Sequence, residues 1–185
     1  MKRLIELLLA IMIMIPALPV IAVASIIIRL TSDGPAIFVQ ERVGRNEKVF
    51  KCLKLRTMAT GTPDIASHEA STSWITPVGR ILRRTKLDEL PQLINVIRGE
   101  MSLVGPRPCL PSQKELVLER RRRGVFSVTP GITGLAQVAG VDMSDPVKLA
   151  TLDSEYVANR TLLGDFRLIL RTVIGSGSGD AVSKS

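Results

Sequence analysis

The chain has 185 residues, the size of one domain of ordinary dimensions, and 45% of them are hydrophobic. That apolar content argues against a disordered protein. An aromatic content of 3% disfavours a protein that stacks single-stranded nucleic acid on its rings. The net charge of +8 suits phosphate-bearing partners such as anionic lipids or nucleotides. Cys52, Cys109 and His68 show no spacing typical of metal ligands.

Residues 1–30 form a long apolar segment that carries a single acidic residue, Glu6, between basic residues at both ends. The segment is long enough to cross a membrane, and it is too long for the apolar part of a secretory signal. Pro16 and Pro19 lie near its middle, and proline breaks or kinks a helix. Because basic flanks favour the cytoplasmic side, we predict a re-entrant helical hairpin that enters and leaves on one face. A kinked helix that crosses once and a buried helix of a soluble protein are the alternatives.

The rest of the chain is predicted to form one catalytic domain, and its elements follow in chain order. The apolar run 37–39, a turn-forming stretch and the alternating polar and apolar residues 49–55 predict a β-hairpin within 37–55. The polar stretch 59–74 is expected to be a long loop that contains His68. Apolar residues at helical spacing predict short helices within 76–99, 112–124 and 145–175, while the Pro- and Gly-rich stretches 102–111 and 128–142 are expected to be non-helical.

These expectations define the fold class and the domain limits. The predicted fold is α+β and mostly α, with the N-terminal re-entrant membrane helix broken at proline. Short amphipathic helices are expected at the membrane interface, together with one small β-hairpin. The catalytic domain is expected to span 31–175, and the Gly- and Ser-rich residues 176–185 are expected to be a flexible tail.

Two adjacent carboxylates, Asp88 and Glu89, lie in a stretch rich in basic residues. Pro91 fits the first turn of a helix, so Asp88 is expected at or near the N-cap, where the helix dipole favours its ionised form. Taken without its surroundings, the pair could be explained as an aspartate that caps a helix and a glutamate that interacts favourably with the helix dipole. Arg83 and Arg107 can each bind a phosphate bidentately, and Mg²⁺ commonly joins carboxylates to substrate phosphates. The acidic pair, the nearby arginines and the apolar residues 1–30 together indicate phosphoryl transfer at a membrane surface.

Four stretches of the chain resemble the bacterial sugar transferases called monotopic phosphoglycosyl transferases: "KRLIELLLA", "VFKCLKLRTM", "LDELPQLINVIRGEMSLVGPRP" and "PGITGLAQV". The resemblance runs from Lys2 to about Arg171. It implies that Asp88 attacks the β-phosphorus of a UDP-sugar, that UMP leaves, and that polyprenyl phosphate then attacks the covalent phosphosugar. It also implies that Mg²⁺ neutralises the diphosphate with Glu89 as its partner, and that Pro19 marks the membrane bend.

The site residues expected on this basis fall into three groups. Asp88 and Glu89 are the expected catalytic residues and metal ligands, and Pro16 and Pro19 are the expected membrane bend. The expected substrate-binding residues are Lys54, Arg56, Arg83, Arg107, Gly131, Thr133 and Gln137.

The resemblance also implies the partners and the location. We expect a UDP-sugar donor whose sugar is an N-acetylated amino sugar, an undecaprenyl phosphate acceptor and a lipid bilayer, with no nucleic acid; a homodimer is left open. The expected location is the bacterial inner membrane, with the catalytic domain on the cytoplasmic face. The chain is expected to be the minimal catalytic form, without the additional N-terminal helices of larger members.

The chain departs from the family pattern at three places. Leu18 precedes Pro19 where some members have serine, and Thr129 stands where many have arginine before "PGITG". Residues 139–141 replace the "NGR" that many members have after "GLAQV". The last two places are expected near sugar or nucleotide, so the donor sugar is the property that the resemblance predicts least well.

A basic scaffold at the membrane surface, binding anionic lipid or nucleic acid, is the alternative function. It would use the run Arg120–Arg123, although a solvated helix face is the simpler interpretation of that run. Such a scaffold would bind with a strong salt dependence and would not respond to Mg²⁺ or UDP-sugars.

Overall fold

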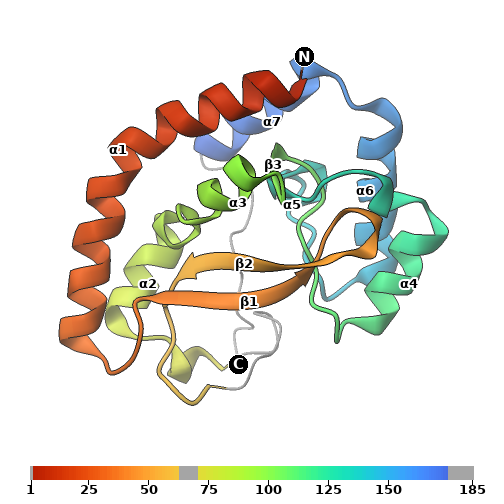
Figure 1. Ribbon diagram of the computed structural model, residues 1–185. Helices are drawn as coiled ribbons and strands as arrows, with labels where there is room; N and C mark the ends of the chain where they lie inside the picture. The colour runs from red at the N-terminus through yellow and green to blue at the C-terminus, as the bar shows by residue number, and fades with distance from the viewer. Residues whose placement is uncertain (1, 63–70, 175–185) are drawn as a thin grey trace.

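The computed structural model describes residues 2–62 and 71–174 and confirms a mostly helical α+β fold (Figure 1). The expected tail and the middle of the loop 59–74, with His68, lie outside the described residues. The first part of the N-terminal helix and the last helix of the chain lie near each other at the top of the molecule, and the β-hairpin lies below them (Figure 1).

The N-terminal apolar segment forms one helix, α1 (Lys2–Thr31), which is continuous through Pro16 and Pro19. The expected break at proline is therefore not seen. Figure 1 shows instead that α1 bends, running along the top of the molecule and then down its left side. Proline bends a helix because its ring clashes with the carbonyl one turn earlier and because it cannot donate a hydrogen bond. Among the described residues, α1 is the one helix whose length and apolar composition would allow it to cross a membrane.

One narrow face of α1 packs against the domain along the whole length of the helix. Its buried residues are Glu6, Ala10, Ala17, Ala24 and Ile28. Most of them are alanines, which let the helix approach its neighbours closely. The opposite side exposes large apolar side chains, more than a water-soluble surface normally carries: Leu4, Leu8, Met12, Ile15, Leu18 and Leu30.

Polar contacts join both ends of α1 to the same domain. At the first end, the Lys2 ammonium lies 2.7 Å from a carboxylate oxygen of Asp165 in α7 (Leu162–Val173). At the other end, Arg56 donates a hydrogen bond of 2.9 Å to the carbonyl of Ser32. The two ends of the apolar helix are therefore held on one body.

The predicted hairpin is confirmed. Strands β1 (Ile37–Val43) and β2 (Val49–Leu55) pair in antiparallel register and are connected through the short 3₁₀ turn η1 (Arg45–Glu47). The register places Ile37 opposite Leu55 and Val43 opposite Val49. Strand β2, which contains Lys54, packs against α3 (Gln92–Arg98).

A second, parallel pair of strands was not predicted. It consists of β3 (Ser102–Val104) and β4 (Gly131–Thr133), which lie in the two stretches expected only to be non-helical. A Cβ atom at Gly131 would lie 2.1 Å from the backbone nitrogen of Gly105, so only glycine allows the two backbones to approach this closely. The pairing brings the loop around Gly105 beside the loop that follows β4.

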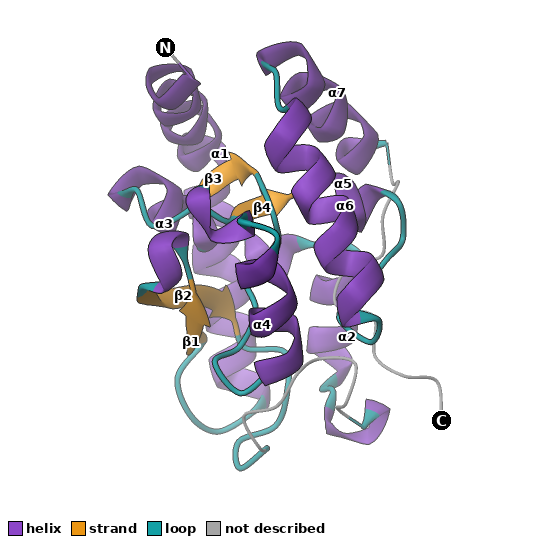
Figure 2. Cartoon of the chain, turned by 90° about the vertical axis from the view of Figure 1, so that its right-hand side faces the viewer, coloured by secondary structure: helices purple, strands orange, loops and turns teal. Residues whose placement is uncertain are grey.

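The helices fall in the three predicted regions. The first region contains α2 (Pro77–Arg84) and α3, and Gly99 ends α3 with a left-handed backbone as expected of a C-cap. The second contains α4 (Lys114–Arg122), and the third contains α6 (Pro146–Asn159) and α7. A further short helix, α5 (Leu135–Val138), follows β4. Figure 2 shows α6 and α7 together on one side of the molecule and α4 beside α6.

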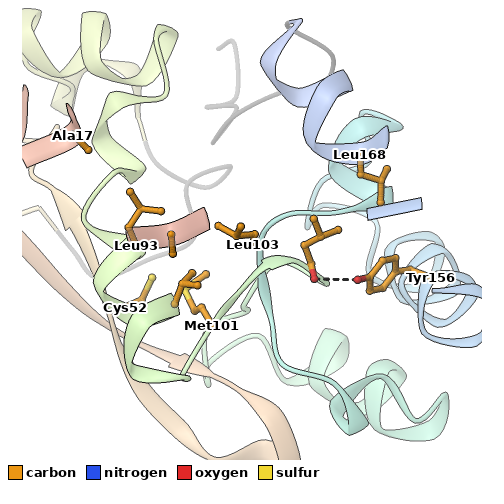
Figure 3. Packing of buried hydrophobic residues seen from close by; sticks show 10 residues of the cluster. Ala17, Cys52, Leu93, Met101, Leu103, Tyr156 and Leu168 are labelled. Atoms are coloured by element: carbon orange, nitrogen blue, oxygen red, sulfur yellow. Dashed lines mark hydrogen bonds between the residues drawn. The ribbon is translucent and has the colours of Figure 1, made fainter. Parts of the chain in front are cut away.

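The main hydrophobic core joins α1 to the rest of the domain (Figure 3). It contains Ala17 of α1, Cys52 of β2 and Leu93 of α3, with Met101 and Leu103 around β3 and Tyr156 and Leu168 of α6 and α7. The Tyr156 hydroxyl lies 3.0 Å from the carbonyl oxygen of Val104 (dashed line in Figure 3). Burial and the contact with Asp165 raise the pKa of Tyr156, so its hydroxyl stays protonated at neutral pH. The apolar helix is therefore part of the core of the domain.

Candidate active site at the acidic pair

The two carboxylates lie in a turn of their own rather than at the start of a longer helix. Asp88 and Glu89 belong to the single-turn 3₁₀ helix η3 (Leu87–Glu89), whereas α3 begins only at Gln92 with Pro91 as its N-cap. The sequence predicts Asp88 at or near the N-cap of this helix, but the N-cap is Pro91 and Asp88 lies outside α3, in the preceding turn. Lys86, which precedes η3, has a left-handed backbone with φ of 57°. A non-glycine residue in that conformation stores strain, which is common beside functional sites.

Both carboxylates are buried, with 4% of Asp88 and 9% of Glu89 exposed. A guanidinium nitrogen of Arg107 lies 2.5 Å from Glu89 Oε1, and the Lys54 ammonium lies 3.8 Å from the same oxygen. Hydrogen bonds between charged partners are short and strong. Burial of a lone carboxylate would be costly, so the two cations compensate its charge. They come from β2 and from the segment after β3, which are far apart in the sequence.

An apolar pocket of about 310 Å³ opens onto Glu89 and Arg107. Leu9 and Ile13 of α1 form part of its wall, and Phe166 and Ile169 of α7 form another part. Its polar lining residues are Lys86, Glu89, Arg107, Thr133, Gln137 and Thr172. A pocket with apolar walls and a few charged groups suits a ligand with an apolar body and an anionic end.

Thr133 and Gln137, both expected in substrate binding, line this pocket. The Gln137 amide nitrogen donates a hydrogen bond of 2.9 Å to the Ile132 carbonyl. Its Oε1 is buried and accepts no hydrogen bond from the described part of the chain. Buried acceptors are normally satisfied, so this oxygen is available to a donor group on a ligand. Thr133 Oγ1 lies 2.6 Å from the hydroxyl of Thr172 in α7.

The other predicted substrate-binding residues make contacts elsewhere. Arg56 binds the chain that follows α1, and Arg83 Nε donates a hydrogen bond of 2.9 Å to Thr57 Oγ1. Arg83 Nη1 is buried without a partner among the described residues. The glycine at Gly131 serves the close approach of β3 and β4, as described above. Lys54 and Arg107 thus lie near Glu89, and Thr133 and Gln137 line the pocket that Glu89 also lines, whereas Asp88 and Lys54 are not among its lining residues. The substrate-binding roles of all the named residues stay predictions.

Sequence reasoning missed the contribution of α7 to the pocket. Phe166 is 56% exposed, although it is a large apolar residue, and it lines the pocket together with Ile169 and Val173. These positions share one face of α7 at a spacing of three and four residues. The sequence therefore contained the spacing of an amphipathic helix in this region. That spacing does not show which other element faces the helix.

The interpretation of Arg120–Arg123 as a solvated face is wrong for its first residue. Arg120 is 1% exposed, and two of its guanidinium nitrogens bind Asp153 Oδ2 at 2.9 and 2.7 Å. The side chains of Arg121 and Arg122 are 56% and 65% exposed. Arg120 is buried because it lies on the inner face of α4, where α6 supplies a carboxylate.

Whether Mg²⁺ fits this site depends on which side chains there can act as metal ligands. In residues 2–62 and 71–174, no group of three or more His, Cys, Asp or Glu side chains is arranged to hold a metal ion. Mg²⁺ usually binds one or two protein carboxylates and completes its shell with water and substrate phosphates. The adjacent carboxylates of Asp88 and Glu89 fit that mode.

Comparison of this chain with known proteins finds a matching family model and several similar proteins. A family model described as bacterial sugar transferase matches residues 1–177. The chain is 41% identical over 164 residues to a UDP-glucose:undecaprenyl-phosphate glucose-1-phosphate transferase of Caulobacter vibrioides, covering 84% of this chain and 61% of that protein. It is 38% identical over 193 residues to an undecaprenyl-phosphate galactose phosphotransferase of Salmonella typhimurium, covering 93% and 39%. It is 34% identical over 190 residues to the exopolysaccharide production protein ExoY of Sinorhizobium fredii, covering 93% and 83%.

The relatives differ in how much of their length the chain matches. It spans about three fifths of the Caulobacter protein and about one third of two further relatives from Komagataeibacter xylinus and Haemophilus influenzae. Residues 1–177, which the family model matches, contain the acidic pair and the loops that surround it.

Proposed function

Because the chain belongs to the bacterial sugar transferase family, we propose that it transfers a sugar 1-phosphate from a UDP-sugar to undecaprenyl phosphate and releases UMP. This would be the first membrane step in the synthesis of a surface glycan. One observation carries the proposal: Glu89, buried beside Asp88, contacts Arg107, lies near Lys54 and lines an apolar pocket between α1 and α7. The charged groups suit a diphosphate, and the apolar walls suit a polyprenyl chain.

The proposed reaction has two steps at one phosphorus atom. First, a carboxylate oxygen of Asp88 attacks the β-phosphorus of the UDP-sugar, and the bond from that phosphorus to the bridging oxygen breaks. UMP leaves with the bridging oxygen, and the phosphosugar stays on Asp88 as an acyl phosphate. Second, a phosphate oxygen of undecaprenyl phosphate attacks the same phosphorus, and the bond to Asp88 breaks. The product is undecaprenyl diphosphate-sugar, and the carboxylate is restored.

Arg107 and Lys54 are proposed to bind the diphosphate oxygens. Both already lie near a carboxylate oxygen, and a planar guanidinium can bind two phosphate oxygens at once. Fixed positive groups stabilise the charge that develops on the transferring phosphoryl group. Asp88 and Glu89 would hold Mg²⁺ together with the substrate, and the bound ion would neutralise part of the diphosphate charge.

The test of this function is UMP release by the membrane-embedded protein from UDP-glucose, UDP-galactose and UDP-N-acetylhexosamines, with undecaprenyl phosphate present. We expect one donor to give UMP and a labelled lipid product. The names of the relatives favour glucose or galactose, while the N-acetylated amino sugar stays a prediction that no observation tests. Binding to anionic vesicles without UMP from any donor would instead favour the basic scaffold.

We propose that α1 enters the membrane and returns to the same face, with the catalytic domain on the cytoplasmic side. Support comes from the contacts of both helix ends with one domain and from the buried face that extends from Glu6 to Ile28. A helix that crossed the bilayer would carry one of these ends away from the domain. The exposed apolar residues of α7, among them Leu163 and Phe166, would lie at the same membrane surface.

Cysteine labelling tests this topology. Lys2→Cys and Arg29→Cys, each in intact inverted and right-side-out vesicles, are expected to react with an impermeant maleimide only from the cytoplasmic face. The parent chain is the control, because Cys52 and Cys109 are buried and burial raises the pKa of the Cys52 thiol, which leaves little reactive thiolate. Labelling of the two positions from opposite faces would contradict the re-entrant proposal.

The apolar pocket is proposed to hold the first part of the polyprenyl chain. Phe166→Ser removes an exposed aromatic wall of the pocket and is expected to raise KM for undecaprenyl phosphate about tenfold, from the apolar contact that is lost. The UMP burst in the absence of acceptor should not change, because the donor does not need this wall. Leu163→Ser is the matched control, since Leu163 is 60% exposed on the same helix and outside the pocket lining. An equal rise in KM for both variants would point to general membrane binding instead.

A further inference from the structure

The segment Pro106–Cys109, which carries Arg107, is held at every backbone carbonyl. Proline has no N–H group, so at Pro106 and Pro108 only the carbonyl can anchor the backbone. Each of the four carbonyls accepts a hydrogen bond from a different donor. In chain order, the donors are Gly131 N at 2.9 Å, Arg120 Nη1 at 2.8 Å, Arg42 Nη1 at 2.9 Å and Val43 N at 2.9 Å.

Arg120 is the donor that holds Arg107 itself. Its Nε and Nη2 bind the Asp153 carboxylate of α6, and its remaining nitrogen, Nη1, donates to the Arg107 carbonyl. Arg120 and Asp153 are 1% and 2% exposed. The forked guanidinium therefore connects α6 to the backbone of Arg107 through groups that water does not reach.

Arg42 holds the next carbonyl from the other side. It is 5% exposed in β1, and its Nε donates a hydrogen bond of 2.9 Å to Gln40 Oε1. Its Nη1 donates to the carbonyl of Pro108. Two buried arginines from separate elements thus hold two consecutive carbonyls at the point where the Arg107 side chain leaves the backbone.

Stability alone is a weak reason to bury the Arg120–Asp153 pair. Removing two charges from water is costly, and apolar residues of similar size often stabilise a protein as well or better. The pair can do one thing that apolar residues cannot. Its guanidinium donates a hydrogen bond to a backbone carbonyl and so fixes the direction and distance of that carbonyl. That carbonyl belongs to the residue whose side chain contacts Glu89 at 2.5 Å.

We propose that Arg120, oriented by Asp153, is a positioning residue for Arg107 in the transfer reaction, and that Arg42 supports the same segment from β1. The proposal rests on the proposed function, which assigns Arg107 to the substrate phosphates. A fixed backbone places the Arg107 guanidinium where the diphosphate binds. A displacement of about 1 Å in such a group can lower a rate by about 100-fold.

A double-mutant cycle tests the proposal. Arg120→Lys keeps the charge beside Asp153 but loses the fork that reaches both the carboxylate and the carbonyl. It is measured in the wild-type chain and in Arg107→Ala, as kcat/KM for UMP release under single turnover, so that slow variants stay measurable. In the wild-type background we expect Arg120→Lys to lower kcat/KM by about 10- to 100-fold. In Arg107→Ala we expect a further loss of less than about twofold.

The outcomes separate positioning from a merely structural role. An equal loss in both backgrounds would overturn the proposal, because a structural effect does not depend on Arg107. Arg122→Lys is the matched control on the same helix, since its side chain is 65% exposed and pairs with Glu119. It should leave kcat/KM unchanged in both backgrounds.

A second cycle applies if Arg120→Lys does not fold. Arg42→Lys, which loses the contact with Pro108 or Gln40, is then combined with Arg107→Ala in the same way. We expect the same dependence on Arg107, and additive losses would overturn the proposal here too. Thermal unfolding of every variant shows which chains are folded.

The same data distinguish this proposal from the proposed function. Arg107→Ala with the wild-type kcat/KM would show that Arg107 does not bind the substrate phosphates, so the proposed role of Arg107 and the inference built on it would both fail. A large loss in Arg107→Ala, together with additive Arg120 and Arg42 effects, would leave the proposed function intact and reject the positioning role alone.

Discussion

Asp88→Asn is expected to lower UMP release by about 1,000-fold or more, the scale of losing a covalent nucleophile. The amide has nearly the shape of the carboxylate but carries no charge and is a poor nucleophile. Asp88 is 4% exposed in the short turn η3, and because the amide is nearly isosteric, the substitution changes the chemistry of the site more than its shape. The measurement is UMP formation over time with the donor identified in the UDP-sugar screen.

The control for this variant is Asp33→Asn, an exposed aspartate outside the pocket, which should keep the wild-type rate. Direct evidence would come from the wild-type chain incubated with the donor but without acceptor. A peptide containing Asp88 should then gain the mass of the phosphosugar, and added undecaprenyl phosphate should remove it. Wild-type turnover by Asp88→Asn would reject Asp88 as the nucleophile.

Glu89→Gln is expected to lower the rate by about 100- to 1,000-fold and to raise the Mg²⁺ concentration needed for half-maximal activity. Glu89 lies 2.5 Å from a nitrogen of Arg107 and 3.8 Å from that of Lys54. The neutral amide would remove one charged partner of these two cations and would remove a proposed metal ligand. Loss of one partner of a buried pair is destabilising by about 3–5 kcal/mol at full burial. The side chains here are 11–14% exposed, so a smaller loss is expected.

Two measurements separate these effects. Thermal unfolding without substrate reports the lost ion pair, and a Mg²⁺ titration of UMP release, starting from protein treated with EDTA, reports the metal site. Glu115→Gln is the matched control, because Glu115 is exposed on α4 and should change neither property. A lower unfolding temperature together with an unchanged Mg²⁺ titration would limit Glu89 to a role as the partner of Arg107.

The helices and the hairpin could be predicted because their signals are local. Thr161 shows this at the junction of α6 and α7, where its hydroxyl accepts a hydrogen bond from Gly164 N and starts the second helix. Gly99 ends α3 with a left-handed backbone that glycine adopts at no steric cost. Each signal lies within a few residues of the feature that it predicts.

The β3–β4 pair and the burial of Arg120 could not be predicted because their causes lie far away in the chain. Each strand has three residues, too few for a period to be visible, and Ser102 pairs with Gly131. Arg120 is one of four consecutive arginines, and only its position on the inner face of α4 separates it from its neighbours. Its partner, Asp153, is on another helix.

Residue type and short spacing were enough to predict the acidic pair, the apolar N-terminal segment, the family and most of the secondary structure. Three features are visible only in the folded molecule: α1 stays continuous through its prolines, α1 and α7 form the walls of one pocket, and Arg107 contacts Glu89. Such contacts depend on how whole elements pack and pair. Packing is decided by complementary surfaces from distant parts of the chain, and no local pattern records which surfaces will meet.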